Sequence, residues 1–240
     1  MRPGFYEEGI IMDKPLEIIG DGAPGEVVIQ ATGKDGFLFK TSMGRIANLT
    51  LRQAGGGKWY GIDIAQGRLE VEDCDITSAS LSCVAVHGGA DPRLRRNLIH
   101  NGKSTGVYVY ENGQGTFEDN DIFSNASAGV AVRSGGNPTL RRNRIHDGKQ
   151  SGVYVCENGQ GTFEDNDIFS NALPGVEVKS GGNPTMRGNR INKNGYEAIW
   201  IREQGKGTYE KNDLKENVRG AWDISKDAVK DVKRSGNIEK

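Results

Sequence analysis

The chain repeats itself with a fixed period. Residues 106–126 read GVYVYENGQGTFEDNDIFSNA and residues 152–172 read GVYVCENGQGTFEDNDIFSNA, so the two segments differ only at Tyr110 and Cys156. Related segments, GVAVRSGGNPTLRRNRI from Gly129 and GVEVKSGGNPTMRGNRI from Gly175, alternate with them, which gives a 23-residue period with two variants. A period of this length is typical of solenoids, in which each repeat packs only on its neighbours.

Positions one period apart keep their chemical character, and four columns of such positions are apolar throughout. Within each repeat the apolar residues alternate with polar ones in runs of three to five residues between Gly, Pro and Asn, which is the pattern of short β-strands. The columns are Val84, Val107, Val130, Val153, Val176, Ile199, Trp222; Val86, Val109, Val132, Val155, Val178, Ile201, Ile224; Val71, Leu94, Phe117, Leu140, Phe163, Met186, Tyr209; and Ile76, Ile99, Ile122, Ile145, Ile168, Ile191, Leu214.

These columns predict an all-β fold with three short strands per 23-residue coil, stacked as parallel sheets around a narrow core. No helical period appears before residue 225. We therefore expect one solenoid domain over residues 1–224, followed by a C-terminal cap or tail over residues 225–240. The low hydrophobic content of 35% and the 35 glycines fit a thin core with many tight turns.

The overall charge argues against two classes of partner. With 31 basic and 32 acidic residues the net charge is −1, which favours neither nucleic acid nor an anionic membrane. No apolar stretch approaches membrane-spanning length. The three cysteines, Cys74, Cys83 and Cys156, form neither a disulfide framework nor a Cys-x-x-Cys pair, and this predicts a reducing, cytoplasmic setting.

Three polar columns predict ladders along the solenoid axis. Asparagine recurs in one column, and we expect its side chains to stack, with the backbone at these corners in the left-handed region that Asn tolerates. Two other columns alternate in charge, so neighbouring coils, about 4.8 Å apart, would pair a carboxylate with a guanidinium above and below it. The columns are Asn97, Asn120, Asn143, Asn166, Asn189, Asn212; Glu72, Arg95, Glu118, Arg141, Glu164, Arg187, Glu210; and Asp121, Arg144, Asp167, Arg190, Asp213.

Several segments resemble a known superfamily. The opening PGFYEEGIIMDKPLEIIGDG resembles the first coils of the pectate-lyase-like right-handed β-helix proteins. The repeats GGNPTLRRNRI and GVYVYENGQGTFEDNDIF are similar to carbohydrate-binding and sugar-hydrolase (CASH or NosD-like) repeats, and to the β-helix module of F-box adaptors and of many bacterial proteins. The resemblance implies a single-stranded right-handed parallel β-helix. It leaves function open, because the superfamily includes lyases, hydrolases, epimerases and scaffolds.

Two further expectations depend on this resemblance. No F-box helices precede the repeats, so an adaptor role is not expected. The sequence also begins inside the family's first-coil pattern, which suggests a fragment of a longer protein or an engineered truncation.

No motif predicts a catalytic or metal site. The acidic clusters at residues 118–121 and 164–167 lie between Arg-bearing coils, so we interpret them as parts of the ladders. The superfamily's alginate epimerases use Asp-Pro-His-Asp, whereas residues 90–93 here read Ala-Asp-Pro-Arg. His100 and His146 share a column with Phe123 and Phe169 but lack a third zinc ligand, and we expect them to pack at a corner. No cofactor is predicted.

The outward positions of the GVYV-type strands predict a ligand-binding face. Aromatic and cationic side chains recur there: Tyr108, Tyr110, Arg133, Tyr154, Lys179, Trp200 and Arg202. Exposed aromatic rings beside cations suit contacts to sugars with acidic substituents. The alternative is purely structural, since Tyr and Trp are good strand residues and stack along any solenoid.

We therefore expect a non-catalytic recognition or scaffold module that binds a glycan or a protein segment along one sheet. A polysaccharide-active lyase, hydrolase or epimerase is the first alternative. A consensus-like engineered solenoid without ligand is the second, although the irregular coils before residue 80 favour a natural origin. Self-association through the exposed sheet remains open.

Overall fold

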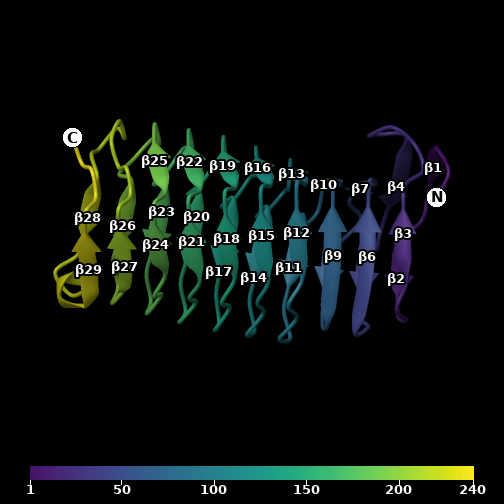
Figure 1. Cartoon of the computed structure of the whole chain (residues 1–240), viewed down its shortest axis with the longest axis horizontal. Coiled ribbons are helices and arrows are strands. Elements are labelled where there is room, and N and C mark those ends of the chain that lie inside the picture. The colour runs from purple at the N-terminus through teal and green to yellow at the C-terminus, as the bar shows by residue number, and fades with distance from the viewer.

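The structure, a computed structural model, describes residues 1–240 and consists of about ten stacked coils (Figure 1). Each coil contributes one short strand to each of three parallel sheets, which run the length of the molecule and enclose its core. The all-β solenoid with three strands per coil is thus confirmed. The single helix, η1 (Val229–Asp231), has three residues, and no helix could cross a lipid bilayer.

The strands are three to five residues long because a corner interrupts each run. Sheet A contains β1 (Gly4–Tyr6), β4 (Val27–Ala31), β7 (Thr50–Gln53), β10 (Asp75–Ser78), β13 (Leu98–His100), β16 (Asp121–Phe123), β19 (Arg144–His146), β22 (Asp167–Phe169) and β25 (Arg190–Asn192). Sheet B contains β2 (Ile10–Met12), β5 (Phe37–Phe39), β8 (Ile62–Ile64), β11 (Val84–Val86), β14 (Val107–Val109), β17 (Val130–Val132), β20 (Val153–Val155), β23 (Val176–Val178), β26 (Ile199–Ile201) and β28 (Trp222–Ile224). Sheet C contains β3 (Glu17–Ile19), β6 (Met43–Ala47), β9 (Arg68–Glu72), β12 (Arg93–Arg95), β15 (Thr116–Glu118), β18 (Thr139–Arg141), β21 (Thr162–Glu164), β24 (Thr185–Arg187), β27 (Gly207–Glu210) and β29 (Val232–Ser235).

The core consists of the apolar columns. All their members are buried except Trp222 and Ile224, which are half-exposed because they belong to the last coil. Strand pairing follows the 23-residue offset from β11 to β28, as in Val84 with Val107, whereas β27 and β29 pair at an offset of 25 residues. Earlier coils differ in length, since Phe37 pairs with Ile62 and Ile62 with Val84. Residues 225–240 contain η1 and β29, and β29 pairs with β27.

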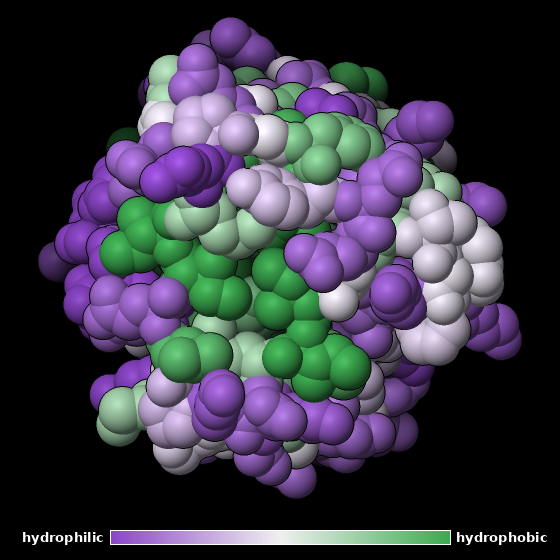
Figure 2. All heavy atoms as spheres, turned by 90° about the vertical axis from the view of Figure 1, so that its right-hand side faces the viewer, coloured by the Kyte–Doolittle hydropathy of each residue, from purple (hydrophilic) through white to green (hydrophobic).

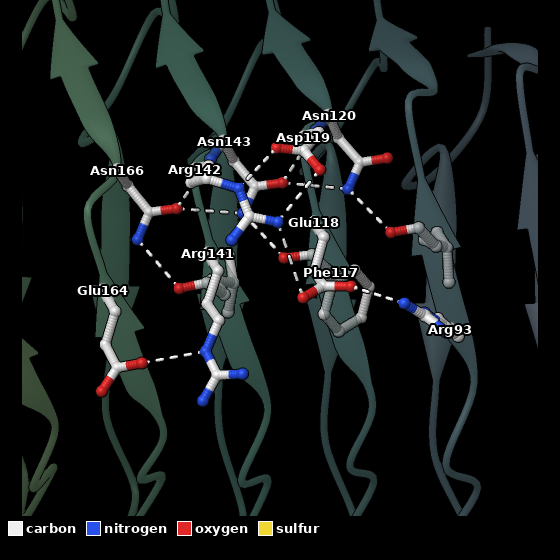
Figure 3. Close-up of polar contacts among 12 residues, drawn as sticks. Arg93, Phe117, Glu118, Asp119, Asn120, Arg141, Arg142, Asn143, Glu164 and Asn166 are labelled. Atoms are coloured by element: carbon white, nitrogen blue, oxygen red, sulfur yellow. Dashed lines mark hydrogen bonds and ion pairs between the residues drawn. The ribbon is translucent and has the colours of Figure 1, made fainter.

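The asparagine ladder is confirmed. The backbone N–H and the Nδ2 group of Asn120 both donate to Oδ1 of Asn143, at 3.0 and 2.9 Å, and Asn143 repeats both bonds to Asn166 (Figure 3). Each Nδ2 also donates to a backbone carbonyl of the preceding coil, as Asn143 does to Phe117 at 2.9 Å. A second ladder, which the columns above did not include, runs through Asn171, Asn194 and Asn217.

The expected backbone conformation of the ladder asparagines is wrong. None has a positive φ; the left-handed residue is the one before, for example Arg96 (φ 57°), Asp119 (φ 56°) and Arg142 (φ 54°). The corner turns at that preceding residue, whose side chain points outward. The asparagine follows it and directs its amide into the solenoid, where the ladder satisfies it.

The charge ladders form only in part. In the second column Arg144 pairs with Asp121 and Arg190 with Asp167, but Asp167 has a guanidinium on one side only and Asp213 pairs with Lys215. In the first column Arg141 pairs with Glu164 at 2.9 Å, and Arg187 pairs with Glu210 at 3.1 Å. Glu118, however, is held by Arg93 at 3.0 Å and by Arg142 at 3.7 Å instead of by the cations of its own column (Figure 3). The left-handed corner residues therefore form a further charged column, in which Arg142 also binds Asp119 and Arg96 binds Asp73.

The histidines of sheet A pack as expected. Phe123 lies between His100 and His146, with ring centroids 4.6 and 5.5 Å away, and Phe169 stacks on the other side of His146 at 4.6 Å. Interplanar angles of 7–11° make this a continuous stack along the axis. The two inner rings, Phe123 and His146, are covered on both faces by their neighbours in the stack.

Candidate ligand-binding face

The outward side of sheet B carries the seven side chains that the sequence predicted as a ligand-binding face. One row of outward positions runs, in strand register, through Asp63, Ala85, Tyr108, Ala131, Tyr154, Glu177 and Trp200. The second row consists of the first residue after each strand, at the corner: His87, Tyr110, Arg133, Cys156, Lys179 and Arg202. The predicted residues are all half-exposed, whereas Cys156 and Glu177 are buried.

A histidine–carboxylate pair lies at the N-terminal part of this face. Nε2 of His87, after β11, is 2.9 Å from Oδ1 of Asp63 on β8, and its Nδ1 is 3.9 Å from Glu111. The hydrogen bond to Asp63 raises the pKa of His87, and burial opposes this only in part. An imidazolium therefore persists to higher pH here than in a free histidine.

Three tyrosines surround this pair. The Tyr110 ring stacks between His87 and Tyr108, with centroid distances of 4.9 and 4.4 Å. Burial is the main cause that raises the pKa of the phenols of Tyr60, Tyr108 and Tyr110. The phenols therefore remain protonated and can donate hydrogen bonds to a ligand.

Asp35 completes the N-terminal cluster. Its Oδ1 accepts a hydrogen bond from the backbone N–H of Tyr60 at 2.7 Å, which anchors the loop that carries this tyrosine. Burial is the main reason that the pKa of Asp35 is raised. The cluster thus combines several groups whose pKa values are displaced from their usual ranges, a property that concentrates at functional sites.

The middle of the face is cationic but largely paired. Arg133 binds Glu157, and the pKa of its guanidinium is raised mainly by this hydrogen bond. Beside it, Cys156 is buried, and burial raises the pKa of its thiol. A thiol in this state is a poor nucleophile, so Cys156 acts as a packing residue.

A hollow of about 340 Å³ lies next to this region, between sheet B and the corner that precedes it. Tyr154, Glu177 and Lys179 line one side of it, and small residues around Ala126–Ala128 line the other. Ser151 and Arg202 fix the buried Glu177 carboxylate at 3.1 and 2.7 Å. Lys179 makes no ion pair and places its ammonium 5.7 Å from the centroid of the Tyr154 ring.

The C-terminal part of the face consists of Trp200 and Arg202. The guanidinium lies 4.3 Å from the centroid of a Trp200 ring and also binds Glu177 and Glu203. One face of the indole is therefore occupied by a cation. Sugar contacts along sheet B would accordingly use hydroxyl groups, ring edges and cations more than open ring faces.

Sequence reasoning brought together Tyr108, Tyr110 and the cations but missed Asp63, Tyr60 and Asp35. Asp63 stands in the column of Tyr108, one coil before Ala85, but the step between the paired strands β8 and β11 is one residue shorter than the regular period. Tyr60 and Asp35 lie outside the strands, where the period carries no information. The apolar residues Phe37, Ile62 and Val84 pair in turn around β8, and their unequal spacing is the signal that could have located Asp63.

The structure contains no group of three or more His, Cys, Asp or Glu side chains suited to a metal ion. The acidic clusters at residues 118–121 and 164–167 are engaged by arginines on adjacent coils. The side chains on the outward face of sheet B can take part in hydrogen bonding, ion pairing and proton transfer.

Comparisons with known proteins bear on the fold. The family model described as the right-handed beta helix region matches residues 35–172 and 104–237. No curated protein matches the sequence. The solved A-modules of the mannuronan C-5 epimerases AlgE4 and AlgE6 from Azotobacter vinelandii are similar, with TM-scores of 0.70 and 0.68 at 15% and 14% identity.

These two matches cover 99% of this chain and 85% and 89% of the epimerase modules. ORF18 of Geobacillus virus E2 is similar over 98% of this chain and 51% of its own, with a TM-score of 0.54 and 11% identity. At these identities the similarity establishes the fold alone.

Proposed function

We propose, from the premise that the chain belongs to the family of right-handed beta helix regions, that the outward face of sheet B binds an extended acidic polysaccharide. The observation that carries the proposal is Lys179, an ammonium without a carboxylate partner, beside the hollow that Tyr154 and Glu177 line. A carboxylated sugar supplies the missing anion, and its hydroxyls suit the fixed carboxylate of Glu177.

The coil spacing supports an extended ligand. Successive outward positions are about 4.8 Å apart along the axis, close to the length of one sugar unit, so a chain lying along sheet B meets equivalent positions at each coil. Phenol hydroxyls and cations alternate along that line from Tyr110 to Lys179, and the next coil carries Trp200 and Arg202. The mannuronan epimerases with a similar fold make oligomannuronate the first ligand to test.

The test is calorimetric titration with oligomannuronate, oligogalacturonate and a neutral oligosaccharide of equal length. We expect the acidic ligands to bind and Lys179→Gln to weaken them by about 1–3 kcal/mol, the range of interface hot spots. Trp200→Ala, which removes the support of Arg202, should have an effect of similar size. Lys193→Gln, the same change at an exposed lysine beside sheet A, is the control and should leave affinity unchanged. Equal binding of the neutral ligand, or no binding at all, would contradict the proposal.

Catalysis on the same glycan is a second candidate, and the Asp63–His87–Tyr110 cluster favours it. Asp63 raises the pKa of the His87 imidazole, and in its protonated form this imidazole, next to the Tyr110 phenol, can donate a proton or stabilise negative charge on a substrate. That capacity suits proton transfer next to a sugar carboxylate, as in lyases and epimerases. Binding alone needs none of these raised pKa values.

One experiment distinguishes binding alone from catalysis. Wild-type protein and His87→Gln are incubated with saturating acidic oligosaccharide, and unsaturated or epimerised products are followed by absorbance and NMR. Product formed by the wild type and lost in His87→Gln, with affinity retained, would establish an enzyme. Saturated binding without product would leave the recognition module as the function.

A further inference from the structure

A second hollow, of about 330 Å³, lies on the outward side of sheet A in the N-terminal half of the solenoid. The loop of residues 20–25 forms one wall through Pro24, and Thr50, Asp75 and Leu98 line the sheet beneath it. Figure 2, which looks onto the N-terminal end, shows apolar atoms gathered in the middle of that face within a hydrophilic rim. Pro24 and Leu98 are not part of the core, so the apolar wall of this hollow is a surface feature of its own.

The loop over the hollow is held in place by Asn48. Its Nδ2 group donates to the carbonyl oxygens of Gly20 and Gly22, at 3.0 and 2.7 Å. The backbone N–H of Gly20 also donates to the carbonyl oxygen of Ala47, at 2.9 Å. The hollow is therefore preformed, and a ligand does not have to order this loop in order to bind.

Asp75 lacks the cation that later carboxylates of its column possess. In strand register the column runs from Asp75 through Leu98 to Asp121, and then to Arg144. Arg144 pairs with Asp121 at 2.9 Å. Leu98 occupies the corresponding position beside Asp75, so a leucine that is 43% exposed stands where the later coil has a guanidinium.

The remaining neighbour of Asp75 does not neutralise its charge. Oδ1 of Asp75 lies 3.0 Å from Nε2 of His100. The Nδ2 amide group of Asn101 lies 2.9 Å from Nδ1 of the same ring, and an amide nitrogen can only donate. Nδ1 is therefore the acceptor, Nε2 carries the proton, and a neutral imidazole donates to Asp75.

Thr50 supplies a second unsatisfied group. It is 2% exposed, and its Oγ1 is buried without a hydrogen-bond partner. Thr50 pairs in register with Asp75 on the neighbouring strand, so the hydroxyl and the carboxylate stand side by side in the hollow. A buried hydroxyl without a partner is destabilising, and a donor placed against both residues would satisfy it.

We propose that this hollow binds a small organic cation, a primary ammonium group on a short apolar stem. The ammonium donates to the Asp75 carboxylate and to Oγ1 of Thr50, while the stem packs against Pro24 and Leu98. The site is separate from the ligand-binding face on sheet B and does not depend on the function proposed for that face.

The donor set suits an ammonium better than a divalent metal ion. Asp73, the other carboxylate that lines the hollow, is bound through both oxygens by Arg96, at 2.7 Å each. Asp75 is therefore the single carboxylate available, whereas Ca²⁺ takes roughly six to eight oxygen ligands. The apolar wall likewise suits a carbon stem.

The test is a titration of the full chain with n-butylammonium chloride, followed by amide proton–nitrogen NMR spectra. We expect saturable shifts of the amide signals of Thr50, Asp75 and Leu98, with a dissociation constant on the order of millimolar, as suits so small a probe. n-Butanol, which has the same stem without the charge, should cause no saturable shift.

Four variants assign the binding to the two unsatisfied groups. Asp75→Asn should weaken butylammonium binding by about tenfold or more, and Leu98→Arg should abolish it by supplying an internal guanidinium. Thr50→Val should weaken binding without lowering the melting temperature, because its hydroxyl has no hydrogen bond to lose. Asp121→Asn, at a carboxylate that Arg144 already pairs, is the control and should bind as the wild type does.

Several results would overturn the proposal. They are the absence of a saturable shift in the wild type, equal shifts with butanol, and unchanged affinity in Asp75→Asn or Leu98→Arg. Displacement of butylammonium by calcium chloride at equal ionic strength would also overturn it, because that result would identify a metal site.

Discussion

Single buried side chains hold neighbouring coils in register, and the ladder asparagines are the clearest case. Asn143 is fully buried, and its Oδ1 accepts two bonds from Asn120 while its own N–H and Nδ2 donate to Asn166. A bond of this kind contributes modestly when formed, but each buried group left without a partner costs about 1–3 kcal/mol. A coil that lacks its asparagine would therefore lower the stability of the fold, because it leaves buried polar groups of the neighbouring coils without partners.

We accordingly expect Asn143→Ala to lower the free energy of unfolding by about 3 kcal/mol or more, since it orphans both donors of Asn120 and the carbonyl of Phe117. Urea denaturation followed by circular dichroism measures the change. Asn137→Ala, at an exposed turn position of the same coil, should cost less than about 0.5 kcal/mol. Equal losses in the two variants would mean that the ladder does not contribute to stability.

The ladder also shows where residue-level prediction succeeds and fails. The column of asparagines was evident from spacing alone, because stacked amides need an identical residue on every coil. The left-handed corner was assigned to the wrong residue, since the rule that Asn tolerates positive φ holds for isolated turns. Here the asparagine side chain must point inward to bond with the buried amide ladder, and the residue before it, such as Arg96 or Arg142, has the left-handed conformation instead.

His87 predicts a pH dependence of stability. Its pKa is raised in the folded protein, mainly by Asp63, so its contribution is fully present below its usual pKa of about 6.5 and is lost as pH rises through the higher folded pKa. The stability difference between wild type and His87→Gln should therefore be largest in mildly acidic buffer and shrink toward alkaline pH. Thermal unfolding of both proteins across this range checks it, and a difference that grows with pH would contradict the assignment.

At the scale of elements, stacks of side chains link strands that are far apart in sequence. On sheet A, β13, β16, β19 and β22 each supply one ring to the His–Phe stack. The rings lie on the outward side, so they stabilise the sheet without enlarging the core. Each stacked pair contributes about 0.5–1.5 kcal/mol beyond the area it buries.

The number of ring neighbours predicts the ranking of two variants. Phe123 has an aromatic ring on each side, whereas Phe169 has one aromatic neighbour, His146, and the Arg144 guanidinium 5.5 Å from its ring centroid. Phe123→Ala should therefore destabilise the protein more than Phe169→Ala, by about 0.5–1.5 kcal/mol. Denaturation of both variants under one buffer condition gives the comparison, and the reverse order would show that burial alone governs these positions.

Element positions were predictable wherever the period was regular. From β11 to β28, pairing follows the 23-residue columns, and the side chains of the predicted ligand-binding face lie on one sheet. Around β8 the spacing is longer than the period on one side, from Phe37 to Ile62, and shorter on the other, from Ile62 to Val84. A column search at fixed spacing therefore stopped at Ala85 and left Asp63 outside the face.

At the scale of the whole molecule, the charge columns distinguish the coils that carry carboxylates from the coils that carry guanidiniums. Glu118 and Glu164 belong to alternate coils, and Arg141 stands between them. Like charges on directly adjacent coils are destabilising, by about 0.2–1 kcal/mol for each pair. The alternation therefore discriminates against any arrangement that skips one coil.

Two deletions test this. Removing residues 129–151, one coil, places Glu118 beside Glu164 and Asp121 beside Asp167, whereas removing residues 129–174, two coils, places them beside Arg187 and Arg190. Added salt screens repulsion, so it should raise the melting temperature of the one-coil deletion. The two-coil deletion should show no rise. A salt response of the same sign and size in both would mean that the ladders do not select register.

The alternation has a consequence for how such a gene can change length. Unequal recombination between repeats inserts or removes whole coils, but only events that span an even number preserve the order of carboxylates and guanidiniums. The near-identity of residues 106–126 and 152–172, against the divergence of the intervening repeat, follows the same two-coil period. The unit that can be gained or lost without disturbing the charge pattern is therefore a pair of coils, twice as long as the unit that the backbone geometry defines.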